Sequence, residues 1–141
     1  SASAVYPPSA SCVTSKTIFD TDVLIWAFRG NPNAQKVVDG ADERAVSAVT
    51  VMELLQGARN KQEQRAITLF LSELGFEAIP ISEAISRRAV IFMETYALKS
   101  GMGLADALIF ATACEKGCVL CSGNLKPFRE IPTLSACAFK P

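Results

Sequence analysis

The sequence predicts an α/β fold, a single three-layer α/β/α domain built on a central, mostly parallel sheet of about five strands. Short apolar runs alternate along the chain with segments of helical periodicity, which is typical of a parallel sheet covered by helices on both faces. The 141 residues, half of them apolar, are enough to bury one core. We find no internal repeat and no interior linker, so one domain is expected.

The first half of the chain alternates two apolar runs with four helical segments. We expect strands over residues 17–20 and 45–49, and helices over residues 22–28, 34–38, 51–58 and 61–74. The turn Gly30-Asn31-Pro32-Asn33 separates the first two helices, and Gly40 ends the second. Thr50 is suited to cap the third helix. The fourth helix has apolar residues at a helical period and ends at Gly75.

The second half of the chain contains three more strand-like runs and two more helical segments. We expect strands over residues 77–81, 118–121 and 134–138, and helices over residues 82–99 and 104–115. Pro80 has no N–H to donate, which places the third strand at an edge of the sheet. Ser82 caps the long helix, and Gly101 and Gly117 end the two helices.

The ionisable residues limit the chemistry. The chain has 14 basic and 14 acidic residues, and this zero net charge argues against a basic nucleic-acid arm but not against a nucleic-acid substrate. It has no histidine, which excludes Ser-His-Asp and Cys-His catalysis, His-ligated zinc and a histidine general base. Acid–base chemistry must therefore come from carboxylates, Lys, Tyr, Cys or a metal-bound water.

The cysteines and the N-terminal segment bear on the cellular setting. Five cysteines, an odd number, argue against a secreted disulfide scaffold and favour the reducing cytoplasm. Cys114, Cys118 and Cys121 lack a fourth nearby ligand, so we expect free thiols there. No apolar stretch is long enough to cross a membrane. Residues 1–15 are expected to be a disordered tail or a tag remnant, and residues 16–141 the folded domain.

Three carboxylates lie in apolar segments of the chain. Asp20 closes the first strand, Glu53 follows Val51 and Met52, and Asp106 interrupts the apolar helix over residues 104–115. A carboxylate in apolar surroundings is costly unless it is paired, hydrogen-bonded or bound to a metal, and no Lys or Arg accompanies these three. We therefore expect the three acids to converge on a divalent cation.

The predicted topology gives these acids a common place. In a parallel α/β sheet, ligands gather at the carboxyl ends of the strands. Asp20 and Asp22 follow the first strand, and Ser122-Gly123-Asn124 follows the fourth. With Asp20, Asp22, Glu53 and Asp106 assigned to a metal, the remainder has 14 basic and 10 acidic residues. This excess of +4 favours a rim that holds phosphates.

Four segments of the chain form a recurring pattern: Phe19-Asp20-Thr21-Asp22-Val23-Leu24-Ile25, Val51-Met52-Glu53-Leu54-Leu55-Gln56-Gly57, residues 104–113 and Ser122-Gly123-Asn124-Leu125-Lys126-Pro127-Phe128. In order and spacing they resemble the PIN domain family of metal-dependent ribonucleases, and most closely its VapC-type bacterial toxins. The resemblance covers roughly residues 16–139. Each segment alone is a weak signal, whereas four in sequence are specific.

The resemblance implies a site and a reaction. Asp20, Glu53 and Asp106 match the family's acidic residues, which bind Mg²⁺ or Mn²⁺ and catalyse attack of a metal-activated water on RNA. The fourth acid usual in the family is missing, because the matching segment offers only Asn124. Asp22, Ser122 and Asn124 form a secondary set around the three acids. The resemblance also implies a homodimer and a cognate antitoxin protein.

Other interpretations of the same residues stay open. Asp20 and Asp22 match the opening D-x-D of haloacid dehalogenase-type phosphatases, although that family also needs an acidic pair after the fourth strand. A catalytically degenerate PIN domain that only binds RNA or a partner is the second alternative. Individually, Asp20 could be a turn residue, Asp22 a helix cap, Glu53 a solvated glutamate and Asp106 a residue favoured by the helix dipole.

Overall fold

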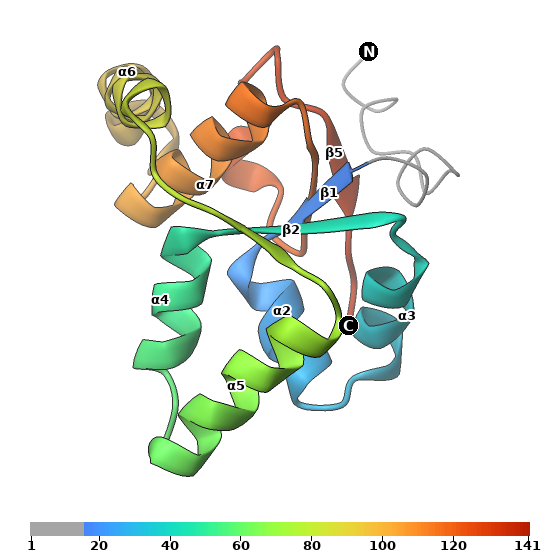
Figure 1. Ribbon diagram of the computed structural model, residues 1–141. Coiled ribbons are helices and arrows are strands. Elements are labelled where there is room, and N and C mark those ends of the chain that lie inside the picture. The colour runs from blue at the N-terminus through green and yellow to red at the C-terminus, as the bar shows by residue number, and fades with distance from the viewer. Residues whose placement is uncertain (1–15) are drawn as a thin grey trace.

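The computed structural model describes residues 16–141, so the expected tail over residues 1–15 lies outside the described residues. The predicted fold class is confirmed (Figure 1). The strands are β1 Lys16–Phe19, β2 Glu43–Ser47, β3 Glu77–Ile79, β4 Val119–Ser122 and β5 Ala136–Ala138. The helices are α2 Thr21–Phe28, α3 Pro32–Gly40, α4 Ala48–Gln56, α5 Lys61–Glu73, α6 Glu83–Ser100 and α7 Leu104–Lys116, followed by the 3₁₀ helix η2 Lys126–Phe128.

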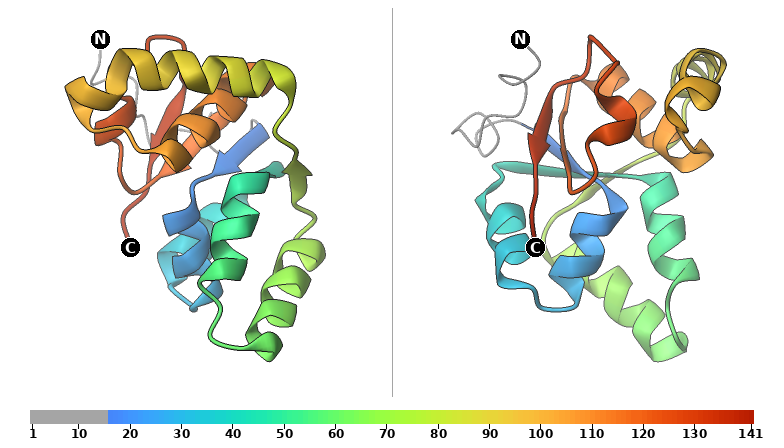
Figure 2. Two further views of the ribbon diagram at one scale, coloured as in Figure 1. Left: turned by 90° about the vertical axis from the view of Figure 1, so that its left-hand side faces the viewer. Right: turned by 180° about the vertical axis from the view of Figure 1, so that it is seen from behind.

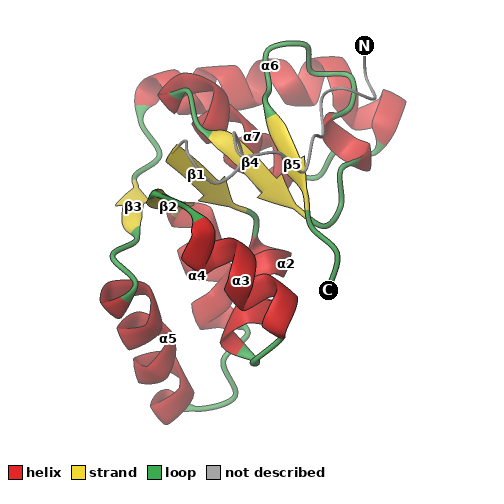
Figure 3. Ribbon diagram, turned by 90° about the vertical axis from the view of Figure 1, so that its right-hand side faces the viewer, coloured by secondary structure: helices red, strands yellow, loops and turns green. Residues whose placement is uncertain are grey.

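The strand order is β3-β2-β1-β4-β5, and every neighbouring pair in the sheet is parallel. The chain adds β2 and β3 on one side of β1, and then crosses back to add β4 and β5 on the other side. The strand order therefore reverses between β1 and β4, which is where open α/β sheets bind ligands. β3 lies at an edge (Figure 3), as Pro80 predicts.

The core consists of two apolar clusters, one on each face of the sheet. Neighbouring residues of β1 separate into them: Ile18 packs in the cluster with Ile85 of α6 and Phe110 of α7. Phe19 packs in the other cluster, with Val23 of α2 and residues of α3 and α5. Figure 1 and the two further views of Figure 2 show α6 on the opposite side of the sheet from α5.

Helix α4 belongs to both layers. Its Val49 packs in the cluster with α6 and α7, whereas its Leu54 packs in the cluster with α2 and α5. Because α4 follows β2 directly, its position fixes where Glu53 lies relative to the carboxyl ends of β1 and β2. This helix is the main link between the fold and the candidate site.

The predicted boundary between β2 and α4 is wrong. The strand ends at Ser47 instead of residue 49, and the helix begins at Ala48 instead of residue 51. The reason is the cap, because Ser47 rather than Thr50 accepts the backbone N–H of Val49, with 3.1 Å between nitrogen and oxygen. Thr50 is a fully buried residue inside the helix. The helix η2 was also absent from the prediction.

The cap predicted for the start of α6 and the glycines predicted to end α6 and α7 are confirmed. The hydroxyl of Ser82 accepts the N–H of Ile85 at the start of α6. Gly101 and Gly117 end α6 and α7 in the left-handed conformation, with φ of 70° and 63°. Within the described residues, no helix has both the length and the apolar character that a bilayer crossing requires.

The cysteine prediction also agrees with the structure. Cys114 and Cys118 are free thiols, and Cys118, Cys121 and Cys137 are buried. Burial raises the pKa of the Cys114 and Cys118 thiols, which keeps both in the neutral form. A free, neutral thiol in apolar surroundings acts as a small core side chain.

Candidate active site

The predicted acidic residues come from four separate elements that meet at the carboxyl edge of the sheet. Asp20 follows β1 directly and Asp22 lies in the first turn of α2. Glu53 lies in α4, which follows β2. Asp106 lies in the first turn of α7, and Ser122 is the last residue of β4. The side of the sheet on which β1 and β4 end thus carries most of the predicted site.

Asp20 is the most buried of the acids, with 9% of its surface exposed. One carboxylate oxygen accepts the N–H of Thr21 and the other accepts the hydroxyl of Ser122, both at 2.8 Å. Burial nevertheless raises the pKa of Asp20 to about 6, and the negative charges of Asp22 and Asp106 contribute to the rise. Asp20 is therefore held firmly and destabilised as a charged group.

Asp22 holds the loop that follows β4. Its carboxylate accepts the backbone N–H groups of Val23, at 2.7 Å, and of Gly123, at 3.1 Å. A Cβ atom on residue 123 would stand 2.6 Å from Oδ2 of Asp22, so a side chain at this position would displace the Asp22 carboxylate from its present position. Burial raises the pKa of Asp22, and the charge of Asp106 adds to the effect. The N-cap of α2 is Asp20, so the alternative that Asp22 caps this helix is wrong.

Glu53 is held by a threonine from a different element. The hydroxyl of Thr21, the first residue of α2, lies 2.6 Å from Oε1 of Glu53 and 3.0 Å from the hydroxyl of Thr50. Glu53 is half-buried, so it is not the fully solvated glutamate of the alternative interpretation. The same Thr21 donates its N–H to Asp20, and thereby contacts two of the three predicted acids.

Asp106 is half-buried at the start of α7, where Oδ2 accepts the N–H of Gly103 at 3.2 Å. Burial raises the pKa of Asp106, and the negative charge of Glu53 raises it further. Asp106 thus also stabilises the helix start, as the dipole interpretation expects. The charge of Glu53 acts on the pKa of Asp106, and the charge of Asp106 acts on the pKa of Asp20.

Within residues 16–141, no cationic side chain is paired with any of the four acids. Among the described residues, the ion pairs of Lys and Arg all involve other carboxylates. Of Ser122 and Asn124, only Ser122 binds an acid; the exposed Asn124 donates its backbone N–H to the Ser122 hydroxyl at 3.0 Å. A dense group of negative charge without cations is the chemical environment that a hard divalent ion prefers.

The carboxylates are near one another but are not arranged as a finished metal site. In the described part of the chain, no three Asp, Glu or Cys side chains are placed to hold one ion. Oε2 of Glu53 and Oδ1 of Asp106 accept no hydrogen bond within that part, so each acid keeps one oxygen for a ligand. The donor set therefore fits Mg²⁺ or Mn²⁺ in charge and chemistry, and three-fold ligation requires side-chain rotation.

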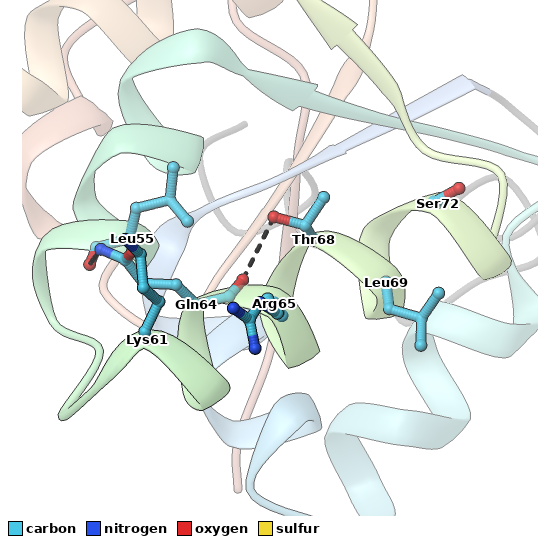
Figure 4. A pocket seen from close by; sticks show the side chains of 7 residues that line it. All are labelled: Leu55, Lys61, Gln64, Arg65, Thr68, Leu69 and Ser72. Atoms are coloured by element: carbon cyan, nitrogen blue, oxygen red, sulfur yellow. Dashed lines mark hydrogen bonds between the residues drawn. The ribbon is translucent and has the colours of Figure 1, made fainter.

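A wide surface pocket lies away from the acidic residues. It has a volume of about 620 Å³ and extends along α5 and the end of α4, without any of the four acids (Figure 4). Its walls are formed by Leu55, Lys61, Gln64, Arg65, Thr68, Leu69 and Ser72. A much smaller pocket of about 70 Å³ includes Glu53 together with Ile25 and Phe28 of α2. The acidic edge is thus an open surface rather than a deep cavity.

A model of the PIN domain matches residues 17–134, a segment that contains all four acids and Ser122. The chain belongs to the PIN domain family. The predicted resemblance to VapC-type PIN domains is confirmed as well. The match disfavours the phosphatase alternative, which also leaves Glu53 and Asp106 without a role. A comparison with curated proteins gave no match.

Comparison with solved structures finds chains that share this fold. A toxin–antitoxin complex from Klebsiella pneumoniae contains a chain with 32% identity and a TM-score of 0.72, and the alignment covers 84% of this chain and 94% of that one. VapBC-1 from nontypeable Haemophilus influenzae has 25% identity and a TM-score of 0.71, over 87% and 97% of the two chains. VapBC2 from Rickettsia felis, at 21% identity and a TM-score of 0.72 over 89% and 99%, shares the fold.

Two residues of the site escaped the sequence prediction. Thr21 was given no role in the site and Thr50 was expected to cap a helix, yet both belong to the hydrogen-bond network of Glu53. A signal was present, because Thr50 and Glu53 are three residues apart and therefore share a face of α4. Nothing in the sequence links either residue to Thr21, which comes from another element.

Proposed function

We propose that this PIN domain is a metal-dependent endoribonuclease and the toxin of a toxin–antitoxin pair. The observation that carries the proposal is the buried Asp20, whose pKa rises to about 6 among three further carboxylates and no cation. Such a group destabilises the ion-free protein, which is the expected cost of a site kept for a cation. The match to the PIN domain supports nuclease chemistry.

Asp20, Glu53 and Asp106 are the residues that we propose as metal ligands, with Asp22 and Ser122 around them. A bound Mg²⁺ or Mn²⁺ supplies a water of lowered pKa and neutralises negative charge on the phosphate. Ser122 and the N–H of Thr21 keep the Asp20 carboxylate fixed, while Thr21 also holds Glu53. The chain thus fixes the Asp20 carboxylate and one oxygen of Glu53 in the ion-free protein.

Cleavage of RNA with and without metal tests the proposal. The wild-type protein is expected to cut RNA with Mg²⁺ or Mn²⁺, leaving 5′-phosphate and 3′-hydroxyl ends, and EDTA or Asp106→Asn should stop the reaction. Asp39→Asn is a matched control, because Asp39 is exposed and belongs to α3, outside the candidate site. Cleavage that persists in EDTA or in Asp106→Asn would contradict the proposal.

One observation favours a second function, that of a degenerate PIN domain that binds without cutting. The position after β4 that usually carries the family's fourth acid is occupied here by the exposed, neutral Asn124. A binding-only protein would retain RNA in a gel-shift assay and leave it uncut with Mn²⁺. Restoring the acid by Asn124→Asp distinguishes the two functions, because it would then raise cleavage from zero rather than alter an existing rate.

An antitoxin protein is the partner that we propose, by analogy with the toxin–antitoxin complex from Klebsiella pneumoniae. The pocket along α5 is the surface we assign to an amphipathic helix of that partner (Figure 4). Leu69 is 56% exposed there, and Lys61 and Arg65 form no ion pair among the described residues. The occupant should accordingly present apolar and acidic side chains.

Co-expression with a candidate antitoxin protein tests this partner. Leu69→Glu should weaken the complex and leave RNA cleavage intact, whereas Glu94→Gln on the remote helix α6 should change neither. Binding that is indifferent to Leu69→Glu would place the partner on another surface. Light scattering on the purified chain would test the homodimer, which we also propose.

A further inference from the structure

Three hydroxyl and carboxyl groups from two helices form a chain of short contacts beside the acidic edge. The hydroxyl of Thr50 lies 3.0 Å from that of Thr21, which lies 2.6 Å from Oε1 of Glu53. Thr50 is fully buried, with an exposed fraction of 0%. Thr21 begins α2 and the other two residues belong to α4, so the contacts join elements that follow different strands.

The number of protons on Thr21 decides which of its two contacts receives the proton. An ionised carboxylate only accepts hydrogen bonds, and a hydroxyl has one proton to donate. When Glu53 is ionised, Thr21 must give its proton to Oε1. Thr21 Oγ1 is also directed at the hydroxyl of Thr50, and because its single proton goes to Glu53, Thr50 acts as a contact that fixes the Thr21 oxygen from the other side.

The other threonines inside helices of this protein behave differently. Thr68, Thr95 and Thr112 each donate to the backbone carbonyl four residues earlier, at 3.1, 2.8 and 2.7 Å. Such bonds are the ordinary fate of a threonine within a helix. Thr50 lies in the first turn of α4, so the residue four positions earlier is in β2 and its carbonyl belongs to the sheet. Its hydroxyl is directed to Thr21 instead.

Thr21 also has a double role. Its backbone N–H donates to Asp20 at 2.8 Å, while its hydroxyl donates to Glu53. One residue therefore sets the positions of two carboxylates that come from different parts of the chain. Without the hydroxyl, the flexible Glu53 side chain would be free to turn away from the charge of Asp106, which raises the energy of its present position.

We propose that Thr50 and Thr21 form a hydroxyl relay that positions Glu53 for the metal-dependent reaction. The two threonines are positioning residues, since neither needs to contact RNA or the ion. The inference rests on the proposed function for its catalytic consequence. The contacts themselves belong to the ion-free protein, so the relay is testable without metal or RNA.

The first experiment measures the relay in the metal-free protein. Unfolding of wild type, Thr21→Val, Glu53→Gln and the double variant gives a double-mutant cycle, and the relay predicts that the two effects are not additive. The pair Thr68→Val and Glu53→Gln is the control, because Thr68 belongs to α5 and donates to its own backbone. Additive effects for Thr21 and Glu53 would overturn the relay.

The second experiment measures what the relay does for the ion and the reaction. Thr21→Val should weaken Mn²⁺ binding in calorimetry about 10-fold or more and lower kcat with little change in KM. Thr50→Val should act in the same direction but less strongly, and Thr21→Ser should restore both values because it keeps the hydroxyl. Unchanged Mn²⁺ affinity in Thr21→Val, or failure of Thr21→Ser to restore it, would overturn the positioning role.

The two experiments separate this inference from the proposed function. A wild-type protein that binds no Mn²⁺ and cuts no RNA would overturn the proposed function and the positioning role together. The double-mutant cycle would still decide whether the relay exists. Thermal unfolding of Thr50→Val and Thr50→Ser shows whether a change in Mn²⁺ affinity or kcat arises from destabilisation of the fold.

Discussion

The acidic residues of this protein differ in whether an arginine neutralises their charge, as Glu63 and Asp20 illustrate. Glu63, at the start of α5, has a side chain that is only 12% exposed and accepts hydrogen bonds from Arg29 and Arg59. The Arg29 guanidinium, and then Arg59, hold the pKa of Glu63 far below its usual range. Asp20 has no cation, and burial raises its pKa to about 6.

The difference separates carboxylates that build the structure from carboxylates kept for a ligand. Glu63 ties α5 to the end of α2 through Arg29, and its charge is matched within the chain. Asp20 and its neighbours are hydrogen-bonded by neutral groups alone, so their charge is left unmatched. The chain has enough arginine to neutralise these acids but places it elsewhere, which is why we assign the acidic edge to a cation.

The largest expected effect is on catalysis. Glu53→Gln should lower RNA cleavage by more than about 100-fold, because it removes a proposed metal ligand. Glu63→Gln removes the same charge from the matched group and should leave cleavage within about three-fold, a shift of less than about 1 kcal/mol in the barrier. Single-turnover rates with Mn²⁺ measure both. Equal losses of cleavage rate in Glu53→Gln and Glu63→Gln would contradict the distinction between metal-binding and structural carboxylates.

The second effect is stabilisation by metal. Mn²⁺ at about 1,000 times its Kd should raise the free energy of unfolding by about 4 kcal/mol, because only the folded chain assembles the site. Thermal unfolding with increasing Mn²⁺ measures this gain. Asp20→Asn should lose most of it and Glu63→Gln should keep it. A gain that survives in Asp20→Asn would move the ion away from the predicted acids.

The third effect is the cost of Asp20 in the absence of metal. The rise of its pKa from 3.8 to about 6 corresponds to about 3 kcal/mol above pH 6, where the folded protein must hold the charge. Asp20→Asn removes this cost but weakens hydrogen bonds to Thr21 and Ser122, by about 1 kcal/mol. The variant should therefore be more stable than wild type by about 2 kcal/mol at pH 8.

The direction of the Asp20 pKa shift determines the pH range in which Asp20→Asn should be more stable than wild type. The pKa of Asp20 is raised on folding, so the folded state binds the proton more tightly and wild type gains stability as the pH falls from about 6 towards 4. The advantage of Asp20→Asn should shrink over that interval and vanish near pH 4. Denaturant unfolding in EDTA at several pH values checks this. If Asp20→Asn is less stable than wild type at pH 8, the charge of Asp20 does not destabilise the folded protein.

The smallest expected effect is that of Glu63, whose charge is matched by Arg29 and Arg59. The pKa of Glu63 is lowered on folding, so its ion pairs stabilise the protein above pH 4.5 and lose that contribution as the pH falls. Glu63→Gln should lower the Tm modestly at neutral pH, and high salt should reduce the difference. A Tm that rises in Glu63→Gln would mean that the arginines do not match this charge.

Much of the fold follows from local patterns in the sequence. The alternation of strands and helices, the edge position marked by Pro80 and the glycine helix ends were all predictable, because each depends on residues within a few positions. The boundary between β2 and α4 was not, since Ala48 and Val49 suit either element and the decision rests on the Ser47 cap. Such local competition is where sequence patterns are weakest.

The candidate site also contains residues that the sequence could predict and residues that it could not. Asp20, Glu53 and Asp106 were predictable as a group, because each is an acid in an apolar segment. The hydroxyl relay was not, since Thr21 and Thr50 are 29 positions apart and meet only through the packing of α2 against α4. The close approach of Asp22 to the backbone of Gly123 is likewise visible only in the structure.

The most direct test is a crystal structure of the protein with bound Mn²⁺, located by its anomalous scattering. We predict one strong peak within about 2.0–2.6 Å of oxygens from Asp20, Glu53 and Asp106, the bond lengths of hard divalent ions. Crystals that show Mn²⁺ only on other surfaces, or no Mn²⁺ at saturating concentration, would contradict the account.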